Sequence, residues 1–300
     1  MSLTKEQIAD WFKRLQNEIC TGLEAIDGQG KFQEDKWKRH GGGGGQTRTF
    51  SGKVIEKGGV NFSAVFGDMP GKITKALGLD QDTFFASGVS IVLHPRNPMA
   101  PIIHMNVRYF EMGSGRWWFG GGIDLTPHYI DTDAARKFHI QLKDICDAHH
   151  PSYYPEFKAW ADDYFYLKHR KETRGVGGIF FDRLSNEESF DKVSRFEFVK
   201  AVGQGFVPIY AAAVNPKKDL KFDEKERAWQ FLRRGRYVEF NLVWDKGTKF
   251  GLDTDGRTES ILMSLPPLAS WTYDYQALPG SEEENTLNLL KKGIDWINHK

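Results

Sequence analysis

Three short runs of β-branched and aromatic residues lie close together in the chain, and they constrain the fold more than any other feature. They span residues 87–94, 102–110 and 116–125, and turns rich in proline, asparagine and glycine separate them. Short apolar runs bounded by such turn residues are typical of antiparallel strands joined by hairpins. We therefore expect an antiparallel meander at the centre of the protein.

The same runs gather polar side chains on one face of the expected sheet. Side chains alternate across a strand, so residues an even number apart point the same way. The polar residues that share a face are Ser90 and His94 in the first run, His104, Asn106 and Arg108 in the second, and Asp124 in the third. Three glycines before Asp124 would let a broad, flat ligand approach the backbone. The pattern indicates either a solvated surface or a site.

Apolar residues at helical spacing occur in separate stretches of the chain. A capping box at Thr4 and Gln7 predicts a first helix that ends near Asp27. Residues 28–46 are polar and glycine-rich, which is typical of a loop. Further helices are expected at 131–149, 155–170, 190–214, 223–235 and after 281, and further strands at 47–50, 54–66, 174–182, 236–245 and 259–265.

Strands in meanders and helices in separate runs are typical of an α+β fold, in which helices cover an antiparallel sheet. No internal repeat is present, and no linker divides the chain after residue 46. A chain of 300 residues, 40% of them hydrophobic, has enough apolar side chains for one large core. We predict a single domain over residues 1–300, with an N-terminal helix at 1–27 and a glycine-rich loop at 28–46.

The composition excludes several classes of protein. A formal net charge of +1 does not favour nucleic acid as a partner. No apolar run approaches the roughly 18–20 residues of a membrane span, and no signal peptide is recognisable. Phosphate-loop and dinucleotide fingerprints are both missing. Two cysteines, Cys20 and Cys146, without metal-type spacing fit a reducing compartment. We therefore expect a cytoplasmic protein.

Histidines and aspartates leave several chemical interpretations open. His94 and His104 sit at matching ends of neighbouring strands, where two imidazoles could bind a metal, transfer protons or fill structural roles. Asp124 and Asp245 are most simply turn residues, but either could act as a base if its neighbours hold it in place. The residues alone do not rank these alternatives.

Three arginines point to an anionic ligand. Arg108 shares the polar face of its strand, and Arg174 and Arg257 adjoin glycines. Arginine binds carboxylates bidentately, although single surface arginines more often form ordinary ion pairs. Three arginines around one glycine-lined surface would suit a polycarboxylate.

The motifs GVSIVLHPRNP, HMNVRYF and WWFGGGIDLTP resemble the oxygen-dependent coproporphyrinogen III oxidase family. The resemblance extends from about residue 37 to about residue 275. It implies a broad antiparallel sheet flanked on both faces by α-helices, and a homodimer that associates through residues 237–272. The implied reaction converts the ring A and ring B propionates of coproporphyrinogen III to vinyl groups, with molecular oxygen as acceptor and no organic cofactor.

The resemblance also implies roles for particular residues. Substrate contacts are implied for Ser90, Asn106, Val107, Arg108, Asp255, Gly256 and Arg257. A metal site is implied for His94, His104, His139 and His169, with His104 also the proton donor, although a divalent metal is not expected to be essential. Arg174 and Asp124 match positions that handle substrate, and Asp245 is the alternative base.

Two positions depart from the family pattern. Lys246 stands where an arginine commonly follows the aspartate, and lysine lacks the planar fork for bidentate contacts. Asp255 replaces a glycine or similar residue. Two other functions compete with the oxidase: a histidine-ligated non-haem metal oxygenase, which metal removal would inactivate, and a non-catalytic tetrapyrrole carrier, which would bind without consuming oxygen.

Overall fold

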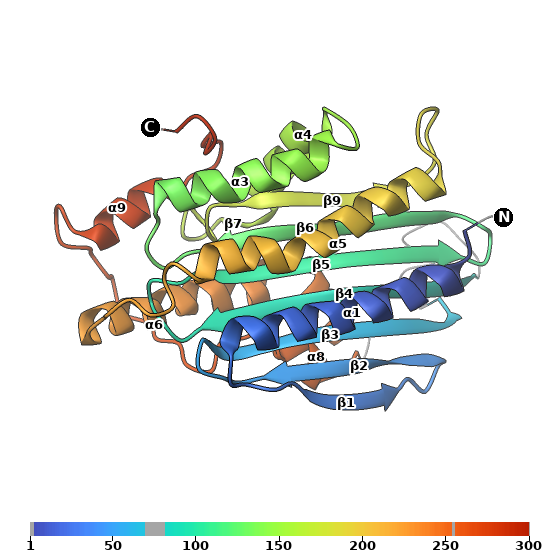
Figure 1. Cartoon of the computed structure of the whole chain (residues 1–300), viewed down its shortest axis with the longest axis horizontal. Helices are drawn as coiled ribbons and strands as arrows, with labels where there is room; N and C mark the ends of the chain where they lie inside the picture. Colours follow the sequence, from blue (N-terminus) through green and yellow to red (C-terminus); the bar gives the residue numbers. More distant parts are fainter. Residues whose placement is uncertain (1–2, 70–81, 254–255, 300) are drawn as a thin grey trace.

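The computed structural model describes residues 3–69, 82–253 and 256–299, and its central layer is a seven-stranded antiparallel sheet (Figure 1). The strands in spatial order are β1 (Gln33–Lys38), β2 (Gly43–Phe50), β3 (Ile55–Asp68), β4 (Thr83–Pro95), β5 (Ile102–Met112), β6 (Trp117–Thr126) and β9 (Gly178–Leu184). Neighbours from β1 to β6 follow chain order, so the predicted meander is confirmed. The short strands β7 (Tyr166–Leu167) and β8 (Glu172–Thr173) form a separate pair.

Helices lie on both faces of this sheet, so the predicted α+β fold is confirmed (Figure 1). They are α1 (Lys5–Asp27), α3 (Thr132–Asp147), α4 (Tyr153–Tyr164), α5 (Lys192–Val214), α6 (Glu224–Glu239), the π-helix η1 (Phe240–Trp244), α7 (Lys246–Asp253), α8 (Thr258–Leu262) and α9 (Glu282–Leu289). In the view of Figure 1, α1 and α5 lie in front of the sheet, and α6 and α8 lie behind it. The capping box expected at Thr4 is present.

The two faces of the sheet differ in chemistry. One face carries a continuous apolar core, in which Val89, Ile91 and Met105 are fully buried beneath α1 and α5. The opposite face carries two small apolar clusters, one around Phe165 and one around Tyr237. This second face is only partly covered, and it holds the polar side chains of the strands.

Two segments expected to be strands are helical. Residues 236–245 form the end of α6 and η1, and residues 259–265 include part of α8. In the first segment the buried side chains recur at helical spacing, at Arg236, Tyr237, Phe240 and Asn241. Two of these buried positions hold the polar residues Arg236 and Asn241, so the helical period cannot be recognised from apolar residues in the sequence.

Other helices and strands begin or end at residues different from those predicted. The expected loop at 28–46 contains β1 and the start of β2, because the glycines allow close pairing of three strands: a Cβ on Gly44 would collide with the Trp37 carbonyl oxygen. The helix expected to reach residue 170 ends at Tyr164. The strand expected from residue 174 begins at Gly178, after Gly177 takes a φ of 76°.

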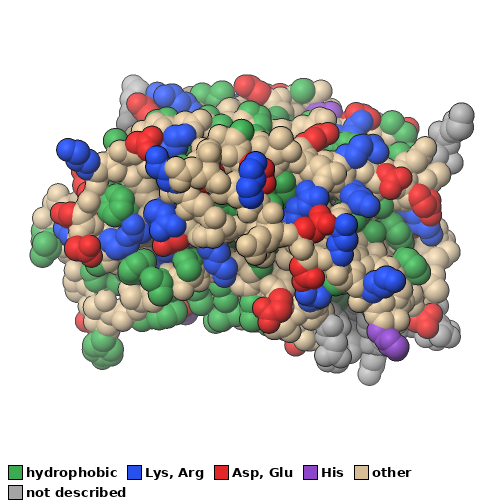
Figure 2. Space-filling view, turned by 60° about the horizontal axis from the view of Figure 1, so that its bottom comes forward, with side chains coloured by type: hydrophobic (Ala, Val, Ile, Leu, Met, Phe, Trp, Pro, Cys, Tyr) green, Lys and Arg blue, Asp and Glu red, His purple; other side chains and the backbone are tan. Residues whose placement is uncertain are grey.

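Charges are mixed on the molecular surface. Figure 2 shows acidic and basic side chains interspersed over one face, without a continuous area of either sign. This distribution agrees with the small net charge. Within the described residues, no helix is long and apolar enough to span a bilayer.

One buried carboxylate ties the first helix to the sheet. Asp27, at the end of α1, is almost fully buried, and its two oxygens accept backbone N–H bonds of 2.7–3.1 Å from Gly30, Lys53, Val54 and Ile55. Burial by itself would raise the pKa of the carboxyl, but these donors outweigh it and hold the pKa below its usual value. Asp27 therefore stabilises the fold as a carboxylate.

We predict that Asp27→Ala lowers the free energy of unfolding by about 2–3 kcal/mol at pH 7, because buried N–H groups lose their acceptor. The measurement is urea denaturation, with the exposed Asp10→Ala of the same helix as control. Since the folded pKa is depressed, the carboxylate's contribution is present above about pH 4 and declines as pH falls through the folded pKa. Equal stability of the two variants at pH 7 would contradict this role.

Candidate active site

The partly covered face of the sheet brings the polar strand residues into register. Ser90 of β4 pairs with Asn106 of β5, which pairs with Gly122 of β6. Two residues further along β5, Arg108 pairs with Gly88 of β4 and with Gly120 of β6. Gly88 is half-buried, but Gly120 and Gly122 are buried, because Arg108 and Asp182 cover the first and Phe180 covers the second. The expected approach of a flat ligand to the backbone of this glycine run is therefore wrong: side chains occupy the space that the glycines leave.

Asp124 is the buried centre of this face. Its carboxylate accepts two hydrogen bonds from Arg174, from Nη2 to Oδ1 at 2.6 Å and from Nε to Oδ2 at 3.1 Å. His104, opposite Asp124 in the register, lies with Nδ1 2.9 Å from Oδ1. Asp124 is 1% exposed and Arg174 3%, whereas the His104 side chain is 22% exposed. His104 is therefore the member of this trio that can meet a ligand.

Arg174 and His104 keep Asp124 ionised. Burial by itself would raise the pKa of Asp124, but the Arg174 charge and the His104 hydrogen bond outweigh it and lower that pKa. The Arg174 guanidinium lies 4.4–4.8 Å from the ring centres of Phe165, Tyr237 and Phe240. Because an ionised carboxylate only accepts, Nδ1 of His104 carries the proton and Nε2 is directed away from Asp124.

Asn241 completes the support of this trio. Its Oδ1 accepts from Nη1 of Arg174 at 3.0 Å, so η1 holds the guanidinium from a third side. Its amide nitrogen lies 3.4 Å from the Ser264 hydroxyl. Asn241 was not predicted at the site, because a strand was expected over residues 236–245.

Arg108 lies further along the same strand face. Its Nη1 donates to Asn106 Oδ1 at 2.8 Å, and its Nη2 donates to Asp182 Oδ1 at 2.9 Å. Asp245 is also held by its neighbours: it accepts from the Tyr164 hydroxyl at 2.8 Å and from the Thr248 backbone N–H at 2.7 Å. Asp245 thus lies at the start of α7 and not in the hairpin turn that the sequence favoured.

The remaining residues expected to contact substrate do not all lie on the polar face. Arg257 forms an ion pair with Asp35 of β1, and Gly256 lies beside it in the chain. Val107 points into the apolar core and is fully buried, so its side chain cannot contact a ligand on the polar face. Asp255 lies outside the described residues.

The four histidines expected at a metal site do not share one site. His94 Nε2 is bonded to the Ser264 carbonyl at 2.8 Å. His139 lies on α3 in the apolar layer, bonded to the Val176 carbonyl at 2.9 Å and to the Tyr154 hydroxyl at 3.0 Å. His169 lies apart from both, between Glu239 and the Trp244 indole N–H.

These partners decide whether the four histidines fit a metal. Burial lowers the pKa of His94, and it lowers that of His139 to about 4, so both rings are neutral and hydrogen-bonded in place. In residues 3–69, 82–253 and 256–299, no group of three or more His, Cys, Asp or Glu side chains could hold a metal ion. The arrangement does not fit the implied four-histidine site.

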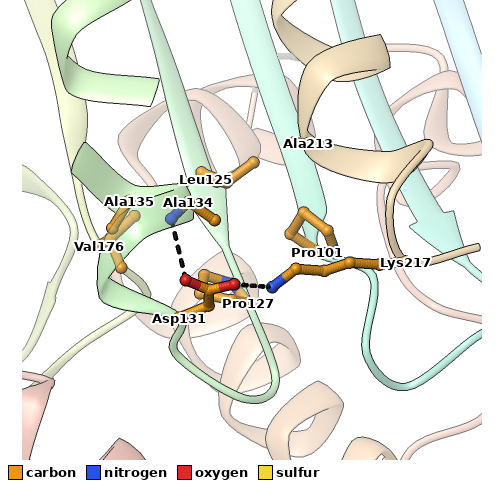
Figure 3. A pocket seen from close by; sticks show the side chains of 9 residues that line it. All are labelled: Pro101, Leu125, Pro127, Asp131, Ala134, Ala135, Val176, Ala213 and Lys217. Carbon is orange, nitrogen blue, oxygen red and sulfur yellow. Dashed lines mark hydrogen bonds and ion pairs between the residues drawn. The ribbon is translucent and has the colours of Figure 1, made fainter. Parts of the chain in front are cut away.

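An apolar hollow on the other face is separate from these polar residues. Figure 3 shows its lining, which includes Pro101, Leu125 and Ala213. The ion pair between Asp131 and Lys217, 3.0 Å long, lies at this hollow. Asp131 also caps α3, so this carboxylate has a structural role.

Comparison with known proteins decides the family. A sequence profile described as coproporphyrinogen III oxidase matches residues 7–296. The chain belongs to the coproporphyrinogen III oxidase family. The oxygen-dependent coproporphyrinogen-III oxidases of Synechococcus sp. strains CC9605 and CC9902 are each 49% identical over 308 residues, which cover 94% of this chain and 85% of theirs. That of Prochlorococcus marinus strain NATL1A is 48% identical over 311 residues, or 95% of this chain and 89% of its own.

The coproporphyrinogen III oxidase match confirms the resemblance read from the sequence, and the structure adds residues that the motifs did not mark. Asn241, Tyr164 and Asp182 all contact expected site residues. Of these, only Asp182 had a signal in the sequence, since the strand expected at 174–182 places it on the same face as Arg174.

Proposed function

We propose that this chain converts the ring A and ring B propionates of coproporphyrinogen III to vinyl groups, with molecular oxygen as the electron acceptor. The observation that carries the proposal is the partly exposed His104, held by the buried Asp124–Arg174 pair on the same sheet face as Arg108. Family membership supplies the substrate class, and this face supplies a proton-transferring group together with a cation for carboxylates.

The sheet face has the extent that a tetrapyrrole tetracarboxylate needs. Arg108 lies on β5, and Arg257 is paired with Asp35 on β1, four strands away. Strands are about 4.8 Å apart, so the two strands are separated by about 19 Å. On β4 this face carries Gly88 and Ser90, whereas α8 covers it on β2 and β3, where Ser260 bonds Thr47 and Asn61. We infer that the two arginines bind propionates on different sides of one macrocycle.

The proposed reaction is balanced without another redox partner. Each propionate loses a hydrogen from its β-carbon and leaves its carboxylate carbon as CO₂, while the remaining two carbons form the vinyl group. The hydrogen and two electrons leave together as the equivalent of a hydride, which with one proton converts O₂ to H₂O₂. The chain must therefore hold the carboxylate, raise the reactivity of the pyrrole and deliver a proton.

We infer that His104 contacts the substrate and that Asp124 acts through it. Asp124 is buried with both oxygens bonded, so it holds His104 in the tautomer whose Nε2 can accept or return a proton. The ionised pair Asp124–Arg174 also stabilises the imidazolium while His104 carries an extra proton. Asp245, bonded to Tyr164, is the other candidate for contact with the pyrrole N–H.

The activity itself is tested with purified protein and coproporphyrinogen III in metal-stripped buffer, under air and under nitrogen. We expect oxygen uptake and two equivalents of CO₂ per macrocycle in air, and neither under nitrogen, without an added metal or organic cofactor. Binding without oxygen uptake would favour the carrier. Loss of activity in a chelator, with recovery on adding metal, would favour the metal oxygenase.

We predict that Asp124→Asn lowers kcat by at least about 100-fold and changes KM much less, because the amide keeps the shape but no longer holds or charges His104 correctly. His94→Ala should have a smaller effect on kcat, since His94 bonds a backbone carbonyl away from this trio. Steady-state kinetics with circular dichroism as a folding control would compare the two. Near-normal turnover of Asp124→Asn would remove Asp124 from the mechanism.

We also propose that two copies associate through the stretch 237–272. Large apolar side chains are exposed along it, at Leu242 and Val243 on η1, Leu252 on α7, and Leu268 and Trp271 after α8. The backbone bond from Ser270 to Phe231 holds the last of these segments against α6. Exposed apolar side chains gathered on contiguous elements are typical of an interface.

We predict a dimer in sedimentation at micromolar concentration, and a shift to monomer when Leu242→Glu and Val243→Glu are combined, because a charge would be buried at the interface. Leu220→Glu is the matched control, since Leu220 is equally exposed but lies outside this stretch. A monomeric wild-type protein would refute the association.

The cytoplasmic location remains a prediction. Cys20 and Cys146 are both buried and unpaired, and burial raises the pKa of Cys20 to about 11 and of Cys146 to about 12. Thiols in this state are unreactive, so they fit a reducing compartment without requiring one.

A further inference from the structure

Arg108 is held between two partners that point at it from different strands. Asn106, on its own strand, accepts from Nη1 at 2.8 Å, and Asp182 of β9 accepts from Nη2 at 2.9 Å. The Arg108 side chain is 37% exposed and that of Asp182 is 32% exposed, so the pair borders the open part of the sheet face. Each partner uses one guanidinium nitrogen, and further N–H groups of Arg108 remain available for a carboxylate.

A local irregularity in β9 places Asp182 there. Gly121 pairs with Phe181 and Phe119 pairs with Leu184, so two residues of β9 lie opposite the single Gly120 of β6. Arg183, the second of them, takes a φ of 54°, which is unfavourable for a side chain other than glycine. A bulge re-aims side chains, and strained backbone gathers at functional sites.

Gly120 leaves room for the ion pair itself. A Cβ at this position would lie 2.5 Å from Oδ1 of Asp182 and 2.8 Å from Nε and Nη2 of Arg108. Any other residue at 120 would therefore displace one or both side chains. The bulge and the glycine are independent features of two strands, and both serve the same contact.

We propose that Asp182 is a positioning residue for substrate binding, which fixes the Arg108 guanidinium so that its remaining donors face a propionate. This proposal rests on the proposed function. A long arginine side chain loses much rotamer freedom when it binds a ligand. Asp182 and Asn106 restrict the guanidinium in advance, so the propionate meets an oriented fork.

The test compares Asp182→Ala, Asp182→Asn and Gly120→Ala with the wild type. We expect Asp182→Ala and Gly120→Ala each to raise KM for coproporphyrinogen III about fivefold with kcat within about twofold, because the ligand must then order Arg108. Asp182→Asn keeps an accepting oxygen and should restore part of the loss. Equilibrium binding of coproporphyrin III, which carries the same four propionates, gives a readout independent of turnover.

The decisive comparison uses Arg108→Ala as background. If Asp182 acts through Arg108, Asp182→Ala should change neither KM nor coproporphyrin binding further in that background. Asp147→Ala is the matched control, since Asp147 also forms a half-exposed ion pair, with Lys143 on α3; its KM should equal that of the wild type.

Several results would overturn the positioning role. An unchanged or lowered KM in Asp182→Ala would do so, and so would an additional loss in the Arg108→Ala background. A fall in kcat and melting temperature with unchanged KM would assign Asp182 to the fold alone. Absence of wild-type turnover with normal coproporphyrin binding by the wild type would count against the proposed function instead, and the binding comparison would still test Asp182.

Discussion

The ion pair between Asp124 and Arg174 is the interaction on which the rest of the site depends. It joins the end of β6 to the segment before β9, and Asn241 adds η1 to the same contact. Both charges are almost fully buried, so removing either one would leave the other uncompensated, at a cost of about 3–5 kcal/mol. Three aromatic rings around the guanidinium keep water away from the pair. His104 takes its orientation from this rigid base.

The sheet divides its two tasks between its two faces. The apolar face, buried under α1 and α5, supplies most of the core and therefore most of the stability. This division frees the opposite face to carry charged and polar side chains beside glycines. Within a single strand such as β5, alternate residues serve the two tasks, as Met105 and His104 do.

The sequence predicted those parts of the protein in which local pattern and tertiary environment agree. Alternation identified β4, β5 and the polar face, and a capping box located α1. The prediction failed at residues 236–245, where the polar residues Arg236 and Asn241 occupy buried helical positions and the alternation of the segment resembles a strand. Partners such as Asn241 could not be predicted, because their contacts join segments far apart in the chain.

Some site residues could be predicted from strand alternation, and others could not. Strand parity alone brought His104, Asn106 and Arg108 together, and register placed Asp124 opposite His104. Parity could not reveal that Arg174 would cover both oxygens of Asp124, or that Asp182 would reach Arg108 through a bulge. Bulges and buried ion pairs depend on three-dimensional packing, which no short-range pattern encodes.

The order of the strands has a consequence for how the chain folds. Strands β1 to β6 are neighbours in both the chain and the sheet, so each pairing closes a local hairpin at small cost in loop entropy. Arg174, by contrast, follows Asp124 by 50 residues, and Asn241 follows Arg174 by 67. During synthesis the ribosome releases the whole meander before it releases either of these residues. The buried support of His104 can therefore form only after the sheet residues that it serves have already left the ribosome.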